Sequence, residues 1–257
     1  MALRASDILY TSWEQIPIRK MKLILQFLPL IRWNVADHWG NSYLKNILLK
    51  QLFKSKSNYL KTTPEQRVDL YTHELDWIQE ITHQFLIPSV TVNKVEYFAP
   101  KDGLTDLGLA KLAEADTRLS RYLLSQRAEY LNTFLACLYS DGSTFTEDNL
   151  KINAVQLAKI EEYQKVSIIR SYFGSRMLLM KSCDNLFPEA PVIAREEKKS
   201  PKNEPKALAT DTGPMWDALI YDLAALPGFP GVANAKAANA WEALNYLDHE
   251  IKKNLKK

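Results

Sequence analysis

The chain has 257 residues, 46% hydrophobic and 25% charged, a composition typical of a soluble globular protein with a sizeable core. The formal net charge of +3, from 33 basic and 30 acidic residues, is too balanced to make nucleic acid the expected partner. The longest apolar run, from Leu23 to Ile31, is interrupted by Gln26 and Pro29 and is shorter than the roughly 20 residues needed to cross a bilayer. We therefore expect no membrane association and a cytoplasmic protein.

Only 8 glycines occur, and clean apolar alternation is rare, which favours helices over a glycine-turned β-sandwich. The predicted fold is mainly α, an irregular helical bundle of six to eight helices with at most a short strand pair.

The first predicted helix follows Ser12, a candidate N-cap with Gln15 as its capping-box partner, although Pro17 allows a second start. A second helix is expected from about Tyr43 to Lys56. The segment Lys45–Lys61 contains five lysines and no acid. It could be a basic patch for a phosphate or an acidic partner, but a solvated helix face is the simpler interpretation.

The clearest helix start is Thr63-Pro64-Glu65-Gln66, which combines a Thr cap, Pro at the first helical position and Gln at the capping-box position. This helix should reach about Gln84. From Ser89 to Gly103 the pattern changes to β-branched residues, so one or two short strands are expected there.

Two amphipathic helices between Leu104 and Tyr139 should form a helical hairpin at the centre of the fold. The apolar residues recur at three- and four-residue spacings in both helices, namely at Leu109, Leu112, Ala113, Leu119, Leu123, Leu131, Phe134, Leu135 and Leu138. A turn is expected at residues 140–144, a loop or short strand at 145–149, and one long helix at about 152–180.

Asp116 lies within the apolar stripe of the first of these helices, on the face that should be buried. A buried carboxylate needs a partner or shifts its pKa upward. Asp116 could therefore be a general acid or base, with Tyr122 or His83 nearby. We favour a structural acid that caps a neighbouring helix or pairs with an Arg or Lys.

The composition changes after Pro188. Residues 189–212 contain three prolines and a run of charges but no aromatic residue, and cannot bury enough apolar surface to offset their ordering entropy. The expected organisation is a helical main domain at 1–188, a flexible linker at 189–212 and a C-terminal helix pair at 213–257. The pair should be an interaction module that packs on the main body or on another chain.

Aromatic residues, four at the edges of elements and one in an amphipathic pattern (Trp241), are candidates for a protein interface, because Trp is enriched at interface hot spots. The candidates are Trp33, Trp39, Trp216, Phe229 and Trp241. The two cysteines, Cys137 and Cys183, lie in apolar helical contexts and are expected to be buried free thiols.

Catalytic and cofactor motifs are absent from the sequence. His73-Glu74 would need a second histidine one turn later to bind zinc, and Trp77 stands there. No phosphate-binding loop, dinucleotide fingerprint or nucleophile elbow occurs. We expect no catalytic residue, no metal and no cofactor.

The order of several motifs resembles proteins from the tail-gene regions of bacteriophages and prophages of the Bacteroidetes type, some of which look like tail assembly chaperones. The motifs run across most of the chain and are Ser-Trp-Glu-x-Ile, YFAPKDGLTDL, EADTRLSRYL, FLACLY, NLFP, MWDALIYDLA and WEALNYLD. The resemblance implies a helical structural protein for virion assembly, in the bacterial host cell or in the virion. No active-site residues follow from it.

The leading functional hypothesis is a non-enzymatic assembly or scaffolding protein that binds protein partners, such as its own copies or tail components. Two alternatives remain: an enzyme with an unmarked site near Asp116, and a nucleic-acid-binding module that uses Lys45–Lys61.

Overall fold

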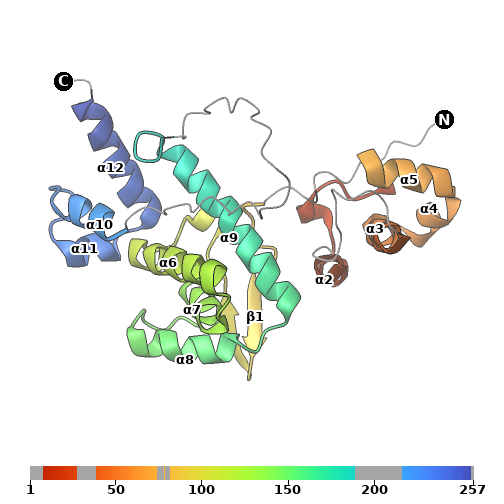
Figure 1. The fold of residues 1–257 in the computed structure, drawn as a ribbon, viewed down its shortest axis with the longest axis horizontal. Coiled ribbons are helices and arrows are strands. Elements are labelled where there is room, and N and C mark those ends of the chain that lie inside the picture. The colour runs from red at the N-terminus through yellow and green to blue at the C-terminus, as the bar shows by residue number, and fades with distance from the viewer. Residues whose placement is uncertain (1–7, 28–38, 74–77, 79–81, 189–215, 256–257) are drawn as a thin grey trace, which may run out of the picture. The chain divides into compact units, whose positions relative to one another are not determined.

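The computed structural model describes residues 8–27, 39–73, 78, 82–188 and 216–255 (Figure 1). These residues form eleven α-helices and one two-stranded antiparallel sheet, which confirms the mainly α class with a short strand pair. The helices are more numerous than the six to eight expected. None of the helices in these ranges is long and apolar enough to cross a membrane.

The chain divides into two compact units. Unit 1 comprises residues 1–82 and 160–173, and unit 2 comprises residues 83–159 and 174–257. The helix α9 (Glu162–Ser182) contributes its first part to unit 1 and the rest to unit 2. The expected linker, 189–212, lies outside the described residues.

The described part of unit 1 contains the first part of α9, a short 3₁₀ helix, Trp13–Gln15, and four complete α-helices. These are α2 (Ile18–Phe27), α3 (Trp39–Leu52), α4 (Lys56–Lys61) and α5 (Pro64–His73). The helix α2 begins after Pro17 and not after Ser12. The side chain of Ser12 makes no capping bond, and Gln15 instead accepts a hydrogen bond from the Thr11 N–H at 3.2 Å.

The capping box at the start of α5 is confirmed. The Gln66 N–H donates to Thr63 Oγ1 at 3.3 Å, and the Thr63 N–H donates to Gln66 Oε1 at 2.9 Å. The expected end of this helix, near Gln84, cannot be traced because residues 74–77 and 79–81 lie outside the described ranges.

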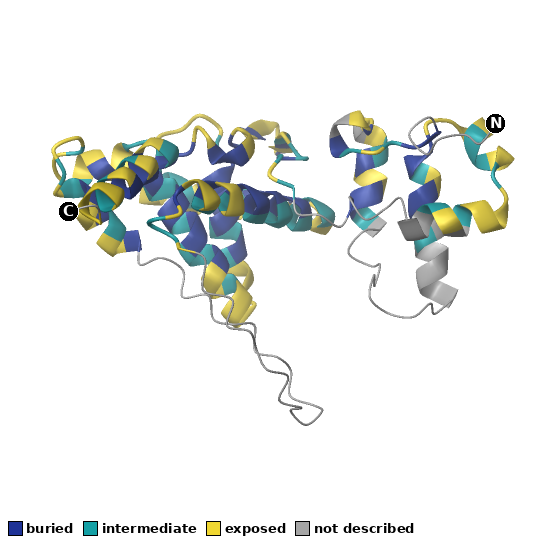
Figure 2. Ribbon diagram, turned by 90° about the horizontal axis from the view of Figure 1, so that it is seen from above, coloured by how far each residue is buried: buried dark blue, intermediate teal, exposed yellow. Residues whose placement is uncertain are grey.

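Unit 2 begins with the strands β1 (Ser89–Val92) and β2 (Val95–Phe98). Asn93 and Lys94 join them with φ angles of 51° and 69°, the left-handed conformation of a two-residue hairpin turn. The helical hairpin that follows is also confirmed, as α6 (Leu109–Ser125) and α7 (Ala128–Leu138). Its apolar faces are buried (Figure 2), but Leu123 is 49% exposed, so the stripe on α6 ends at Leu119.

The prediction of a loop at 145–149 and a single helix at 152–180 was wrong. The helix α8 (Glu147–Leu157) starts earlier because Thr146 caps it, its Oγ1 accepting the Asn149 N–H at 3.3 Å. The chain then breaks before α9, where the Glu161 N–H donates to Gln164 Oε1 at 3.0 Å and a new helix begins.

The C-terminal segment forms three helices and not a pair: α10 (Trp216–Ala224), α11 (Val232–Ala237) and α12 (Ala240–Asn254). The expected helix from Val232 is interrupted because backbone groups at residues 238 and 240 form hydrogen bonds with the segment that precedes and begins α6. The Leu109 N–H donates to Ala238 O at 2.8 Å, and the Ala240 N–H donates to Leu107 O at 2.9 Å. Asn239 then caps α12 by accepting the N–H groups of Trp241 and Glu242.

The three C-terminal helices pack on the body of unit 2 in the same chain. Besides the backbone bonds near α6, the Trp241 indole donates to Gly103 O at 2.6 Å. The Asp248 carboxylate accepts the backbone N–H groups of Asn185 and Leu186, each at 2.8 Å, just after the end of α9. The structure thus shows the first of the two expected arrangements, in which these helices cover their own body.

A variant that ends at Pro188 should lose the cooperative folding of unit 2. It lacks several buried side chains, of which the five large apolar ones are Trp216, Ile220, Leu223, Leu244 and Leu247. At about 1.5–3 kcal/mol each, their burial is comparable to the whole stability of a typical domain. Amide hydrogen exchange in α6 with thermal unfolding by circular dichroism measures the effect.

The matched control ends at Asn254 and removes only the last three residues, of which Leu255 is 75% exposed. It should unfold like the full chain. Retained protection of α6 in the variant that ends at Pro188 would contradict the packing described above.

Candidate functional site

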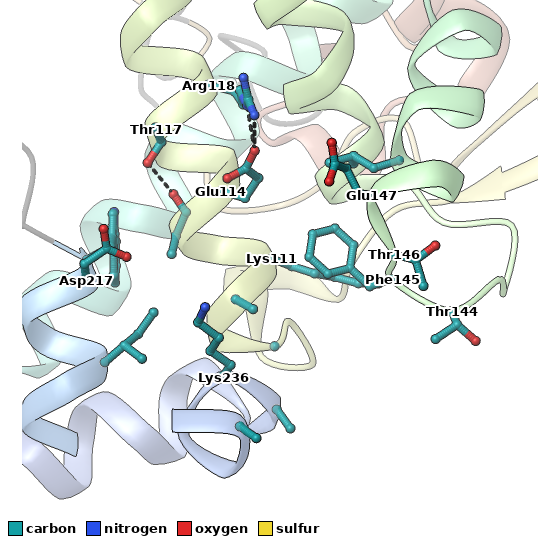
Figure 3. A pocket seen from close by; sticks show the side chains of 18 of the residues that line it. Lys111, Glu114, Thr117, Arg118, Thr144, Phe145, Thr146, Glu147, Asp217 and Lys236 are labelled. Atoms are coloured by element: carbon teal, nitrogen blue, oxygen red, sulfur yellow. Dashed lines mark hydrogen bonds and ion pairs between the residues drawn. The ribbon is translucent and has the colours of Figure 1, made fainter. Parts of the chain in front are cut away.

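A groove with a volume of about 1200 Å³ runs along α6 in unit 2 (Figure 3). We call it the α6 groove. Its floor is α6, from Ala110 to Arg121. One wall is formed by residues 144–147 and Leu150, at the start of α8, and the other by α10 and α11.

The floor is the polar face of an amphipathic helix. Lys111, Glu114, Arg118 and Arg121 follow one another at spacings of three, four and three residues, which places them on one side of α6. The apolar stripe of the same helix faces the core, so packing against α7 turns the charged stripe towards the groove.

The α8 wall carries an aromatic side chain because of how this helix begins. Phe145 immediately precedes the Thr146 cap, and Leu150 follows the cap by four positions, the two positions of a hydrophobic staple. Phe145 remains 36% exposed, and the Lys111 ammonium lies 5.5 Å from the centre of its ring. The groove therefore contains an accessible aromatic surface beside a cation.

The opposite wall is attached to the body of unit 2 through Asp116. Arg176 of α9 forms an ion pair with this carboxylate, with 2.6 Å between Nε and Oδ1. The Trp216 indole N–H donates to the other oxygen, Oδ2, at 3.1 Å. Trp216 lines the groove, so the buried carboxylate positions one of its walls.

These contacts support the structural interpretation of Asp116. The residue is 5% exposed, as its position in the apolar stripe predicts, and each of its oxygens has a partner. An Arg is one of the two kinds of partner that the sequence predicts. His83 is exposed, and Tyr122 is half-buried in the last part of α6.

Two ion pairs neutralise part of the groove. On the floor, Arg118 Nη2 lies 2.6 Å from Glu114 Oε1. On the α8 wall, Lys151 Nζ lies 2.7 Å from Glu147 Oε1. The hydrogen bond from Lys151 and its charge lower the pKa of Glu147. Both acids are therefore occupied by neighbouring cations of their own helices.

The aromatic interface candidates are scattered. Trp33 lies outside the described residues, and Trp39 begins α3 with a side chain that is not described. Trp216 is only 8% exposed. Phe229 is half-buried with its ring edge-on to Tyr246, 5.5 Å away, and Trp241 is half-buried against the Gly103 carbonyl. Of the five, the structure places only Trp216 at the α6 groove.

The basic segment Lys45–Lys61 lies in unit 1, on α3, α4 and the turn between them. Its lysines at 50, 54, 56 and 61 are exposed. The Lys50 ammonium lies 5.8 Å from the centre of the Tyr59 ring, and the Arg67 guanidinium lies 4.1 Å from the same centre.

Both cysteines are buried free thiols, as predicted. Burial raises the pKa of the Cys137 thiol and also that of Cys183. The thiolate fraction of each cysteine at neutral pH is therefore smaller than that of an exposed cysteine, which disfavours nucleophilic chemistry at either position.

Among the residues that the structure describes, no group of three His, Cys, Asp or Glu side chains could hold a metal ion.

Sequence reasoning missed the residues that define the α6 groove, above all Lys111, Arg121, Phe145 and Lys236. The charged residues look like an ordinary solvated helix face. A usable signal was Phe145, a large aromatic residue in an otherwise polar turn, directly before a Thr that caps a helix.

Comparison of the chain with protein-family models, with curated proteins and with solved structures finds no match.

Replacing Asp116 by Asn should lower the free energy of unfolding by about 3 kcal/mol, because the largely buried Arg176 would lose its ion pair with this carboxylate. The neutral amide oxygen can still accept from Trp216. Chemical denaturation measures the loss. The control is Glu114→Gln, in a more exposed pair on the same helix, which should cost less than about 1 kcal/mol. Equal losses for the two variants would refute the structural role of Asp116.

Both thiols should react slowly with a thiol-specific reagent in the folded protein and rapidly after denaturation. Their raised pKa values keep them protonated, and burial excludes the reagent. The measurement is the rate of reaction of full-length protein with dithionitrobenzoate, with and without denaturant. Rapid reaction of either thiol in the native protein at neutral pH would contradict the burial described here.

Proposed function

We propose that the protein is a non-enzymatic assembly protein that binds a segment of a partner protein in the α6 groove. The observation that carries the proposal is the groove itself, which is large, open along one helix and lined by charged, polar and aromatic side chains from four helices. Such a mixed surface with an accessible aromatic ring suits protein recognition.

The rigidity of the walls supports this proposal. The α8 wall starts at a capped helix end, and the α10 wall is held by the buried Asp116–Trp216 hydrogen bond. A groove with fixed walls loses less conformational entropy when a partner binds. The engagement of both Asp116 oxygens also supports a structural and not a catalytic use of this residue.

The biological setting that we propose is tail or virion assembly in a phage or prophage, with tail components or further copies of the chain as partners. The motifs of the resemblance support this setting. Three of them, YFAPKDGLTDL, EADTRLSRYL and MWDALIYDLA, contain or directly precede parts of the groove floor and of the α10 wall.

Site-specific photo-crosslinking in cells of the native source tests the proposal. A benzophenone amino acid in place of Phe145 should form an adduct with one defined protein, identified by mass spectrometry. The control position is Val155, which is 64% exposed on α8 but does not line the groove. An adduct with a second copy of the chain would identify self-assembly. Equal labelling from positions 145 and 155 would refute the groove as the binding site.

A further inference from the structure

The α6 groove carries positive charge that its own acids do not balance. Lys111 and Arg121 are on the floor, and Lys236 extends from α11 towards α6 (Figure 3). Among the described residues, none of these three cations forms an ion pair with a carboxylate. Lys111 and Arg121 instead lie over the rings of Phe145 and Tyr130, contacts that leave their charge in place.

Two acidic residues that line the groove already form ion pairs with cations of their own helices. Glu114 is neutralised by Arg118, and Glu147 by Lys151, so that among the described residues lining the groove only Asp217 remains against the three cations. The groove is thus complementary to an anionic partner, and electrostatic complementarity guides both encounter and specificity.

The spacing of the floor cations sets a distance for the partner's acids. Lys111 and Arg121 are ten positions apart on α6, which corresponds to about 15 Å along the helix axis. An extended chain advances about 3.3 Å per residue, so two of its carboxylates would span this distance when they are about four to five residues apart.

A second, smaller pocket favours an extended partner over a helical one. It has a volume of about 350 Å³ and meets the α6 groove at Gly108 and Lys111, which line both. One turn of a helix about 10 Å wide and 5.4 Å long already occupies about 420 Å³. The smaller pocket therefore suits an extended chain, and Phe98, 55% exposed, offers an apolar contact there.

We infer that the α6 groove binds an extended acidic segment of a partner protein. Two carboxylates about four to five residues apart meet Lys111 and Arg121, and an apolar side chain beside the first carboxylate contacts Phe145. This inference rests on the proposed function and specifies the chemistry of the partner.

Fluorescence anisotropy of the full-length protein with labelled peptides tests the inference. The probe is a glycine-serine peptide with two glutamates five positions apart and a leucine next to the first. One comparison peptide has the same composition with adjacent glutamates, and another has glutamine at both positions. The spaced acidic peptide should bind most tightly. Its affinity should fall as the ionic strength rises from about 0.01 to about 0.15 M, because the Debye length shortens from about 30 to about 8 Å.

Charge-removing variants locate the binding site. Lys111→Met and Arg121→Gln should each weaken binding by about two- to fivefold, the range expected for partly exposed ion pairs. The control is Lys159→Met, an exposed lysine of unit 2 outside the groove, which should bind like the parent protein. Equal binding of the three peptides, or equal effects of the three substitutions, would overturn the inference.

Two further results separate this inference from the proposed function. If an oligothymidine probe binds more tightly than the acidic peptide and depends on the same cations, the groove binds nucleic acid, and both proposals fail. If position 145 crosslinks to a defined protein but the spaced acidic peptide does not bind, the proposed function stands and the acidic partner is wrong.

Discussion

The buried carboxylate of Asp116 is the interaction on which the arrangement of unit 2 depends. It lies on α6, pairs with Arg176 of α9 and accepts the indole N–H of Trp216 at the start of α10. Removing two charges from water costs several kcal/mol per ion, and this cost is offset only when both partners are correctly placed. The network therefore favours the one packing of α6, α9 and α10 in which all of its contacts form.

The same network links the core to the surface. Asp116 itself is buried, but Trp216 forms part of the wall of the α6 groove, and the polar face of α6 forms the floor. The helix α6 therefore has three roles. Its apolar stripe packs in the core, its buried Asp116 positions one wall of the groove, and its charged face forms the floor. A change in the core at Asp116 would therefore also alter the shape of the proposed binding site.

The groove combines features that suit recognition of a partner chain. The ion pairs at Glu114 and Glu147 neutralise both acids, while Lys111, Arg121 and Lys236 keep their charge. Of these cations, Lys111 lies next to the exposed ring of Phe145. The C-terminal helices pack on the rest of unit 2, and two of them, α10 and α11, form one wall of the α6 groove. In the proposed function they would meet the partner as this wall and not as a separately tethered module.

Features decided by neighbouring residues could be read from the sequence. The capping box at Thr63, the strand pair after Ser89 and the amphipathic hairpin of α6 and α7 depend on contacts within a few positions or within one repeating pattern. The burial of Asp116 also followed from its place in that pattern.

Only the tertiary structure decided the partners of Asp116, because Trp216 is 100 residues away in the chain. The break between α11 and α12 is equally non-local, since the Ala238 carbonyl and the Ala240 N–H bond to the backbone on either side of Gly108. The α6 groove is also a non-local feature, because its residues come from four helices and only the packing of these helices brings their charges together.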